Sequence, residues 1–101
     1  MIIPKGCTVV NTFVIPFTED DIEVMYITYQ QYGTTIVEKT LPDCTFADNK
    51  ILVGLSQEDT LRFHTSYTID IQIRIRLKNG VVTKSKVVSV RTDELLKTGV
   101  I

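Results

Sequence analysis

The side chains that usually carry catalysis are few in this sequence. A nucleophile needs a base close to it, most often a histidine, and the single histidine, His64, lies in the stretch Leu61-Arg62-Phe63-His64-Thr65 without a catalytic motif around it. A pairing of His64 with Cys7 or Cys44 in space stays open, but we interpret His64 as a capping or surface residue. The sequence therefore predicts no catalytic residue and no enzymatic activity.

Metal and phosphate sites also lack ligands at a recognisable spacing. A zinc site usually needs four closely spaced Cys or His ligands, whereas Cys7, Cys44 and His64 are widely scattered. The acidic stretch 19–23 offers oxygen ligands for Ca²⁺ but lacks the twelve-residue loop of an EF-hand, so we interpret it as a solvated acidic turn. The five glycines are scattered and form no phosphate loop. We expect no metal and no cofactor.

Length and composition predict one soluble domain that spans residues 1–101. The chain is 44% hydrophobic and 23% charged, as ordinary globular proteins are. No apolar run approaches the ~18 residues that span a bilayer, and the first residues do not form a signal peptide. We therefore expect no membrane contact. We also expect that the protein is made and kept in a reducing cytoplasm. Two scattered cysteines fit this expectation, and a Cys7–Cys44 disulfide is left open.

The charges are segregated along the chain. Residues 1–60 carry nine acidic and three basic residues, a net charge of −6, whereas residues 61–101 carry three acidic and eight basic residues, a net charge of +5. Two oppositely charged patches could bind head to tail between copies of the chain and close a ring. The two sets could equally attract each other within one fold, and the sequence leaves both possibilities open.

Alternating apolar residues give the clearest structural prediction. Isoleucine or leucine occupies every second position of Ile69–Leu77, which predicts a strand with one buried face. Asn79-Gly80 follows, and both residues tolerate the positive φ of a type I′ turn. A second strand, Val81–Arg91, completes the predicted hairpin.

The register of this hairpin is ambiguous. A two-residue loop places Ile69 opposite Val90, Ile71 opposite Val88 and Leu77 opposite Val82. The same register turns Lys84 and Lys86 onto the apolar face, which is costly. A bulge near Ser85 or a wider loop would turn one or both lysines outward, and we expect one of these.

The remaining chain predicts an all-β fold. Further strands are expected at Thr8–Ile15, Ile22–Gln31, Thr34–Thr40, Cys44–Ala47 and Lys50–Leu55. Ser56 caps a predicted helical turn over Gln57–Phe63, and a short C-terminal helix is expected over residues 92–97, before Gly99. About seven strands in this length predict a two-sheet, immunoglobulin-like β-sandwich, although the sequence contains no Trp.

Candidate interface residues come from two groups of side chains. Basic residues gather on the terminal hairpin, and tyrosines combine contact area with a polar tip. The candidates are Tyr29, Tyr32, Arg74, Arg76, Lys84 and Lys86. The basic stripe is either a solvated face or a protein contact. Residues 68–101 contain no aromatic residue to stack on bases, which argues against nucleic acid. The tyrosines, among them also Tyr26 and Tyr67, are either interface anchors or half-buried residues at the sheet rims.

Four segments resemble a known group of proteins. They are Met1-Ile2-Ile3-Pro4-Lys5-Gly6, the stretch Leu55–Phe63, the strand Ile69–Leu77 and Asp93-Glu94-Leu95-Leu96. Together they are similar to small proteins encoded in phages and prophages of Gram-positive bacteria, often near virion-structure genes. The resemblance covers the whole chain and implies a structural or virion-assembly role without enzymatic activity. Its implied partners are other virion proteins or further copies of the chain, and its implied location is the virion.

The sequence therefore predicts a structural protein that acts through protein–protein contacts. Edge strands such as Thr8–Ile15 are natural contact points, because an edge leaves backbone donors and acceptors free. The alternative is a β-sandwich binding module for a host protein or a carbohydrate, which would use the loops at one end. The absence of Trp argues against the carbohydrate version.

Overall fold

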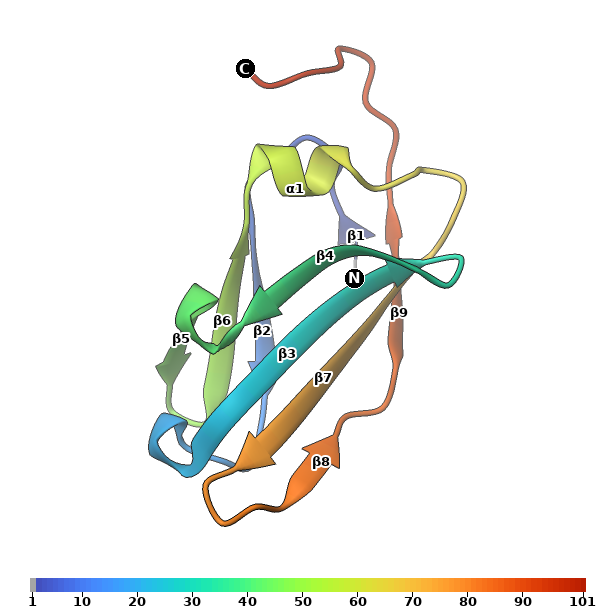
Figure 1. The fold of residues 1–101 in the computed structure, drawn as a ribbon. Helices are drawn as coiled ribbons and strands as arrows, with labels where there is room; N and C mark the ends of the chain where they lie inside the picture. The colour runs from blue at the N-terminus through green and yellow to red at the C-terminus, as the bar shows by residue number, and fades with distance from the viewer. Residues whose placement is uncertain (1) are drawn as a thin grey trace.

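The fold consists of two β-sheets packed face to face (Figure 1). The computed structural model describes residues 2–101. The strands are β1 (Ile2–Ile3), β2 (Val9–Val14), β3 (Ile22–Gln31), β4 (Thr34–Thr40), β5 (Cys44–Ala47), β6 (Lys50–Leu55), β7 (Ile69–Leu77), β8 (Val82–Lys84) and β9 (Val88–Thr92). The larger sheet has the order β1-β9-β7-β3-β4, with β8 also paired to β7, and the smaller sheet has the order β2-β6-β5. The predicted two-sheet β-sandwich is confirmed.

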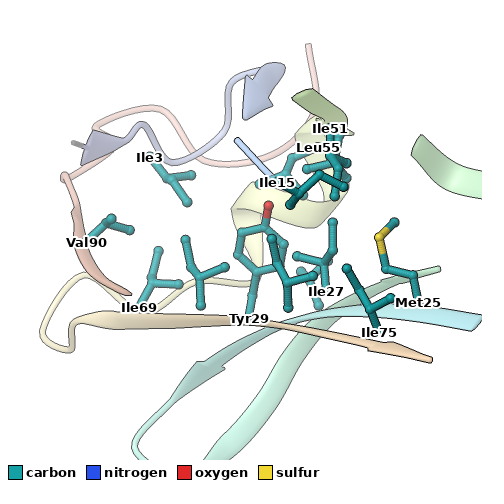
Figure 2. Packing of buried hydrophobic residues seen from close by; sticks show 14 of the residues in the cluster. Ile3, Ile15, Met25, Ile27, Tyr29, Ile51, Leu55, Ile69, Ile75 and Val90 are labelled. Carbon is teal, nitrogen blue, oxygen red and sulfur yellow. The ribbon is translucent and has the colours of Figure 1, made fainter. Parts of the chain in front are cut away.

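The core lies between the two sheets and follows from the alternation of side chains. Ile69, Ile71, Ile73 and Ile75 of β7 are all buried, while the residues between them face outward or are half-buried. Figure 2 shows side chains of the larger sheet pointing toward those of the smaller sheet, such as Ile51 and Leu55. This interdigitation removes a continuous apolar layer from water, which is the main driving force for the fold.

The predicted strand boundaries are largely confirmed. Five of the predicted strands, from Ile22–Gln31 to Ile69–Leu77, have the expected bounds, and Thr8–Ile15 contains β2. The predicted strand Val81–Arg91 is instead divided into β8 and β9, which both pair with β7. The sequence did not indicate β1, a two-residue strand that pairs in parallel with β9 and buries Ile3.

The loop of the terminal hairpin differs from the type I′ turn that the sequence predicts. Gly80 has a φ of 90°, but Asn79 is not in the left-handed region. Leu77 donates its backbone N–H to the carbonyl of Val81 (2.8 Å), so three residues rather than two form the loop. The prediction of Leu77 opposite Val82 is therefore wrong. The wider loop lets Lys78 donate its backbone N–H to the carbonyl of Asp21 (3.0 Å).

The hairpin contains both features that the sequence offered as alternatives, the wider loop and the bulge near Ser85. The wider loop places Lys84 opposite Arg74 on the outer face. One extra residue between Lys84 and Val88 then restores the predicted pairing of Ile71 with Val88. At this bulge, Ser85 donates its N–H to the carbonyl of Ile73 (2.8 Å), and its hydroxyl accepts the N–H of Ile73 (2.9 Å). Both lysines are exposed, as expected.

The predicted helical turn after Ser56 is confirmed as α1 (Gln57–Leu61). The Ser56 hydroxyl accepts the N–H of Asp59, and the Asp59 carboxylate accepts the N–H of Ser56. The two other helical segments are single 3₁₀ turns, Glu19–Asp21 and Leu41–Asp43. In residues 2–101, no helix has the length and apolar character needed to cross a membrane.

The predicted C-terminal helix is wrong. Thr92 ends β9, and residues 93–101 form no helix or strand. The Asp93 carboxylate, expected in a first helical turn, instead accepts the backbone N–H of Lys5 (3.2 Å). Leu95 packs so closely on Gly6 that a methyl group added to this glycine would lie 2.6 Å from Leu95 Cδ2. Contacts with the N-terminal segment thus replace a helix that would have had few residues to stabilise it.

Candidate functional site

The histidine and cysteines occupy structural or isolated positions, not one site. His64 donates its backbone N–H to Gln31 Oε1 (2.7 Å), its Nδ1 accepts the N–H of Ser66 (3.1 Å), and its ring contacts Tyr67. Cys7 and Cys44 are free thiols. Burial raises the pKa of the Cys44 thiol to about 11, which keeps it protonated and a poor nucleophile near neutral pH.

The acidic stretch 19–23 forms a turn whose carboxylates serve local contacts. Asp21 Oδ2 accepts the backbone N–H of Thr18 (3.2 Å) and its hydroxyl (3.0 Å). Glu23 forms an ion pair with Arg76 (2.8 Å). Over residues 2–101, the structure brings together no group of three His, Cys, Asp or Glu side chains that could hold a metal ion.

Tyr29 belongs to the core, so its prediction as an interface residue is wrong. Its side chain is fully buried, and its hydroxyl accepts a hydrogen bond from Asn11 Nδ2 (2.8 Å), a buried amide on the opposite sheet. Burial raises the pKa of Tyr29 to about 12. Tyr29 and Ile27 lie on the inner face of β3, whereas Tyr26 and Thr28 lie on its outer face. Alternation along β3 could have separated the two tyrosines.

Three of the predicted basic residues do come together, on the outer face of the larger sheet. Lys84 is opposite Arg74, and Tyr26 is opposite Arg74 on its other side. Arg76 lies two residues further along β7. A hollow of about 290 Å³ lies among these side chains, lined by Val24, Tyr26, Arg74, Ile75, Arg76 and Val82. We call Tyr26, Arg74, Arg76, Val82 and Lys84 the cationic face.

The charges of the cationic face are incompletely balanced. Arg76 is paired with Glu23, but both side chains are about half exposed (50% and 48%), so water and salt weaken the pair. Arg74 and Lys84 form no ion pair with any residue from 2 to 101. Like charges directly opposite on neighbouring strands destabilise a sheet. A partner that supplies carboxylates here would relieve this repulsion.

The remaining candidates, Tyr32 and Lys86, lie outside the cationic face. Lys86 is exposed in the bulge between β8 and β9. Tyr32 occupies the turn after β3, where its side chain is 83% exposed and stacks on Tyr67 with ring centroids 5.1 Å apart. Its φ of 50° is unusual for an aromatic residue. The sequence named Tyr26 as either an interface anchor or a rim residue and missed Val82, because the place of both beside Arg74 depends on pairing between strands.

Buried Gln31 fixes the loop that carries Tyr67 beside Tyr32. Its Nε2 donates to the carbonyls of His64 (2.8 Å) and Tyr67 (3.0 Å), and its Oε1 accepts the N–H of His64. These bonds join the end of β3 to the loop before β7. The stacked tyrosines therefore form a fixed aromatic surface at the opposite end of β3 from the turn 19–21.

Comparison with known proteins supports the fold and assigns no family. No family model matches the sequence, and no curated protein matches it. Among solved structures, the chain is similar to the Ig-like domain of mouse leukocyte-associated immunoglobulin-like receptor 1, solved as a strand-swapped dimer. The TM-score is 0.51 at 13% identity, over 93% of this chain and 88% of that chain. At this identity the likeness concerns the fold alone, and the predicted Ig-like sandwich is confirmed.

Proposed function

We propose that this chain is a non-enzymatic phage or prophage structural protein that acts through protein–protein contacts at the cationic face. The observation that carries the proposal is the juxtaposition of Arg74 and Lys84, two cations on neighbouring strands that form no ion pair within residues 2–101 and lie beside a hollow. Such a pair is unfavourable in the isolated domain and becomes favourable when a partner supplies carboxylates. The virion as location follows only from the resemblance of the sequence.

The composition of the cationic face supports a protein partner. Tyr and Arg are enriched at protein interfaces and supply most of the residues that dominate binding energy. Tyr26 and Val82 are about half exposed, at 43% and 54%, and can bury further apolar area on binding. The hollow between them would take an apolar side chain of the partner, and the surrounding cations would pair with acidic residues around it.

The partner is another virion protein or a second copy of this chain. The turn Glu19–Asp21 is exposed and acidic, so it could supply the carboxylates in a head-to-tail contact between copies. A contact between two different patches produces rings or filaments, as virion parts require. The strand-swapped dimer of the mouse domain supports association of an Ig-like domain with another protein chain, including its own copy.

The self-assembly version is tested by the native mass at low and high salt, measured by size-exclusion chromatography with light scattering. We expect an oligomer whose mass falls in high salt and falls equally in R74E/K84E, because both changes remove the contact at the cationic face. The control R62E/K78E changes the charge equally at two exposed cations outside the face and should retain the oligomer. A monomer at every concentration and salt would refute self-assembly, and loss of the oligomer in both variants would refute the cationic face as the contact.

A second candidate function is a binding module that uses Tyr32 and Tyr67. The fixed aromatic surface favours this function, because flat exposed rings can stack on a sugar ring or on an apolar protein surface. A glycan array would show binding that Tyr32→Ala abolishes and Tyr26→Ala preserves. An array without signal above background would refute the carbohydrate version.

A further inference from the structure

Strand β2 has an open edge. Among residues 2–101 it pairs with β6 on one side, and no strand pairs with it on the other. Natural edges are usually protected by charged residues, proline or bulges, yet Val9–Val14 (VVNTFV) contains no charged residue, proline or glycine. The side chains of Val10 and Val14 lie on the outer face of β2, where they are 65% and 78% exposed.

The backbone groups that point outward from this edge can be identified. Ile15 donates its N–H to the carbonyl of Asn49 (2.9 Å), which continues the β2–β6 ladder by one pair. Antiparallel strands alternate between residues that bond to the partner strand and residues that point away. Asn11 and Phe13 therefore bond to β6, while the N–H and C=O groups of Val10, Thr12 and Val14 face the open edge.

An apolar cleft lies beside the open edge, between the two sheets. Its volume is about 350 Å³, and its lining includes Phe13, Ile15 and Phe17 on one side and Ile73, Ser85 and Val88 on the other. The larger sheet has six strands and the smaller has three. One strand added to β2 would extend the smaller sheet and cover the cleft.

We propose that the C-terminal tail of a second copy supplies this strand, through residues 96–101. In the chain itself this segment belongs to no helix or strand, and Figure 1 shows it leaving the body of the domain beyond β9. Leu96 is 100% exposed and Ile101 is 94% exposed. Ile101 donates its backbone N–H to Gln57 Oε1 (3.0 Å), and its carbonyl accepts a hydrogen bond from Gln57 Nε2 (3.4 Å).

The tail matches the open edge in pattern and length. In an antiparallel register with Leu96 beside Phe13 and Val100 beside Val9, residues 96, 98 and 100 face the cleft and Lys97 faces solvent. The length of six residues equals that of β2.

This inference rests on the proposed function only in assuming that the chain works through protein contacts, and it names a second copy as the partner. Backbone hydrogen bonds and apolar burial hold the added strand, so high salt should leave it largely intact. The contact at the cationic face should instead dissociate in high salt. The two contacts can therefore fail separately.

The register is tested by cross-linking two variants in a Cys7→Ser, Cys44→Ser background at high salt. The proposed pairing places Thr12 opposite Lys97, with Cα atoms about 5.5 Å apart, which a disulfide can join. A mixture of T12C and K97C chains should form a disulfide-linked heterodimer under mild oxidation. The matched control T45C with K97C, on the other exposed edge of the same sheet, should form at least tenfold less. Equal yields would overturn the proposal.

A second measurement tests the role of the strand itself. Because the Thr12 N–H is not used by β6, Thr12→Pro should leave the domain folded but block the added strand. Loss of one hydrogen bond should weaken association at least about fivefold, measured by sedimentation at high salt. Thr12→Val should associate as the parent chain does. A monomeric parent chain, or association that persists after deletion of residues 96–101, would overturn the proposal.

Discussion

The hydrogen bond between Asn11 and Tyr29 links the two sheets inside the core, and its removal should be costly. Asn11 Nδ2 donates to the Tyr29 hydroxyl over 2.8 Å, and the two residues are 2% and 0% exposed. Tyr29→Phe keeps the ring and removes only the acceptor. The buried amide of Asn11 then loses its partner, and the expected destabilisation is about 1–3 kcal/mol.

A double-mutant cycle separates the lost bond from the lost hydroxyl. Asn11→Leu also leaves one polar group without its partner, so it should destabilise the domain by a similar amount. In the double variant both polar groups are gone, and an apolar pair of comparable shape can be nearly neutral. We therefore expect a favourable coupling of about 1–2 kcal/mol between the two substitutions.

Urea unfolding is the suitable assay. With a slope of about 1–3 kcal/mol per molar urea, Tyr29→Phe should lower the unfolding midpoint by roughly 1 M. The exposed Tyr26→Phe is the control and should change the midpoint little. If Tyr29→Phe changes the free energy of unfolding by less than about 0.5 kcal/mol, or if the cycle shows no coupling, the reasoning about the buried pair is refuted.

Three further predictions concern pH and backbone conformation. The pKa of Tyr29 rises through burial to about 12, so the unfolded chain loses this proton near pH 10 while the folded chain keeps it; stability should be lost between pH 10 and 12, and urea titrations of Tyr29→Phe should lack this component. Tyr32→Asn should change the free energy of unfolding by less than about 1 kcal/mol in a melting experiment, because the gain from a residue that suits a φ of 50° is offset by loss of the Tyr32–Tyr67 stack; a larger change in either direction would contradict this. Gly6→Ala should destabilise the domain by at least about 1 kcal/mol in the same melting assay, because φ is 76° and the new methyl would lie 2.6 Å from Leu95 Cδ2; an unchanged melting temperature would contradict this.

Local patterns were sufficient to predict most strands. The alternation in Ile69–Leu77 and the turn residues between the other strands gave correct bounds, because side-chain period and turn chemistry are properties of neighbouring residues. Strand β1 escaped detection because two residues carry no period. The C-terminal helix failed for a related reason, since the Asp93 carboxylate binds Lys5, a partner 88 residues away.

The candidate site was less predictable, because a site depends on which strands are neighbours. The sequence grouped Arg74, Arg76 and Lys84 on one hairpin, but Tyr26 joins them through the β3–β7 pairing. Tyr29 shows the converse error. Composition favoured it as an interface residue, whereas its partner Asn11, on the opposite sheet, places it in the core. Apart from its place in the alternation of β3, no local signal separates the two tyrosines.

The position of Lys84 links the fold to the proposed contact. A two-residue loop would direct Lys84 toward the core opposite Ile75, and the three-residue loop moves it to the outer face opposite Arg74. The bulge at Ser85 then reverses this shift, so that Val90 returns to the core opposite Ile69. The three-residue loop and the bulge do not require a lysine at position 84. An acidic residue there would be compatible with both and would pair with Arg74. A lysine there instead opposes a like charge. The cost of this arrangement to the isolated domain is the reason to seek its compensation in a partner.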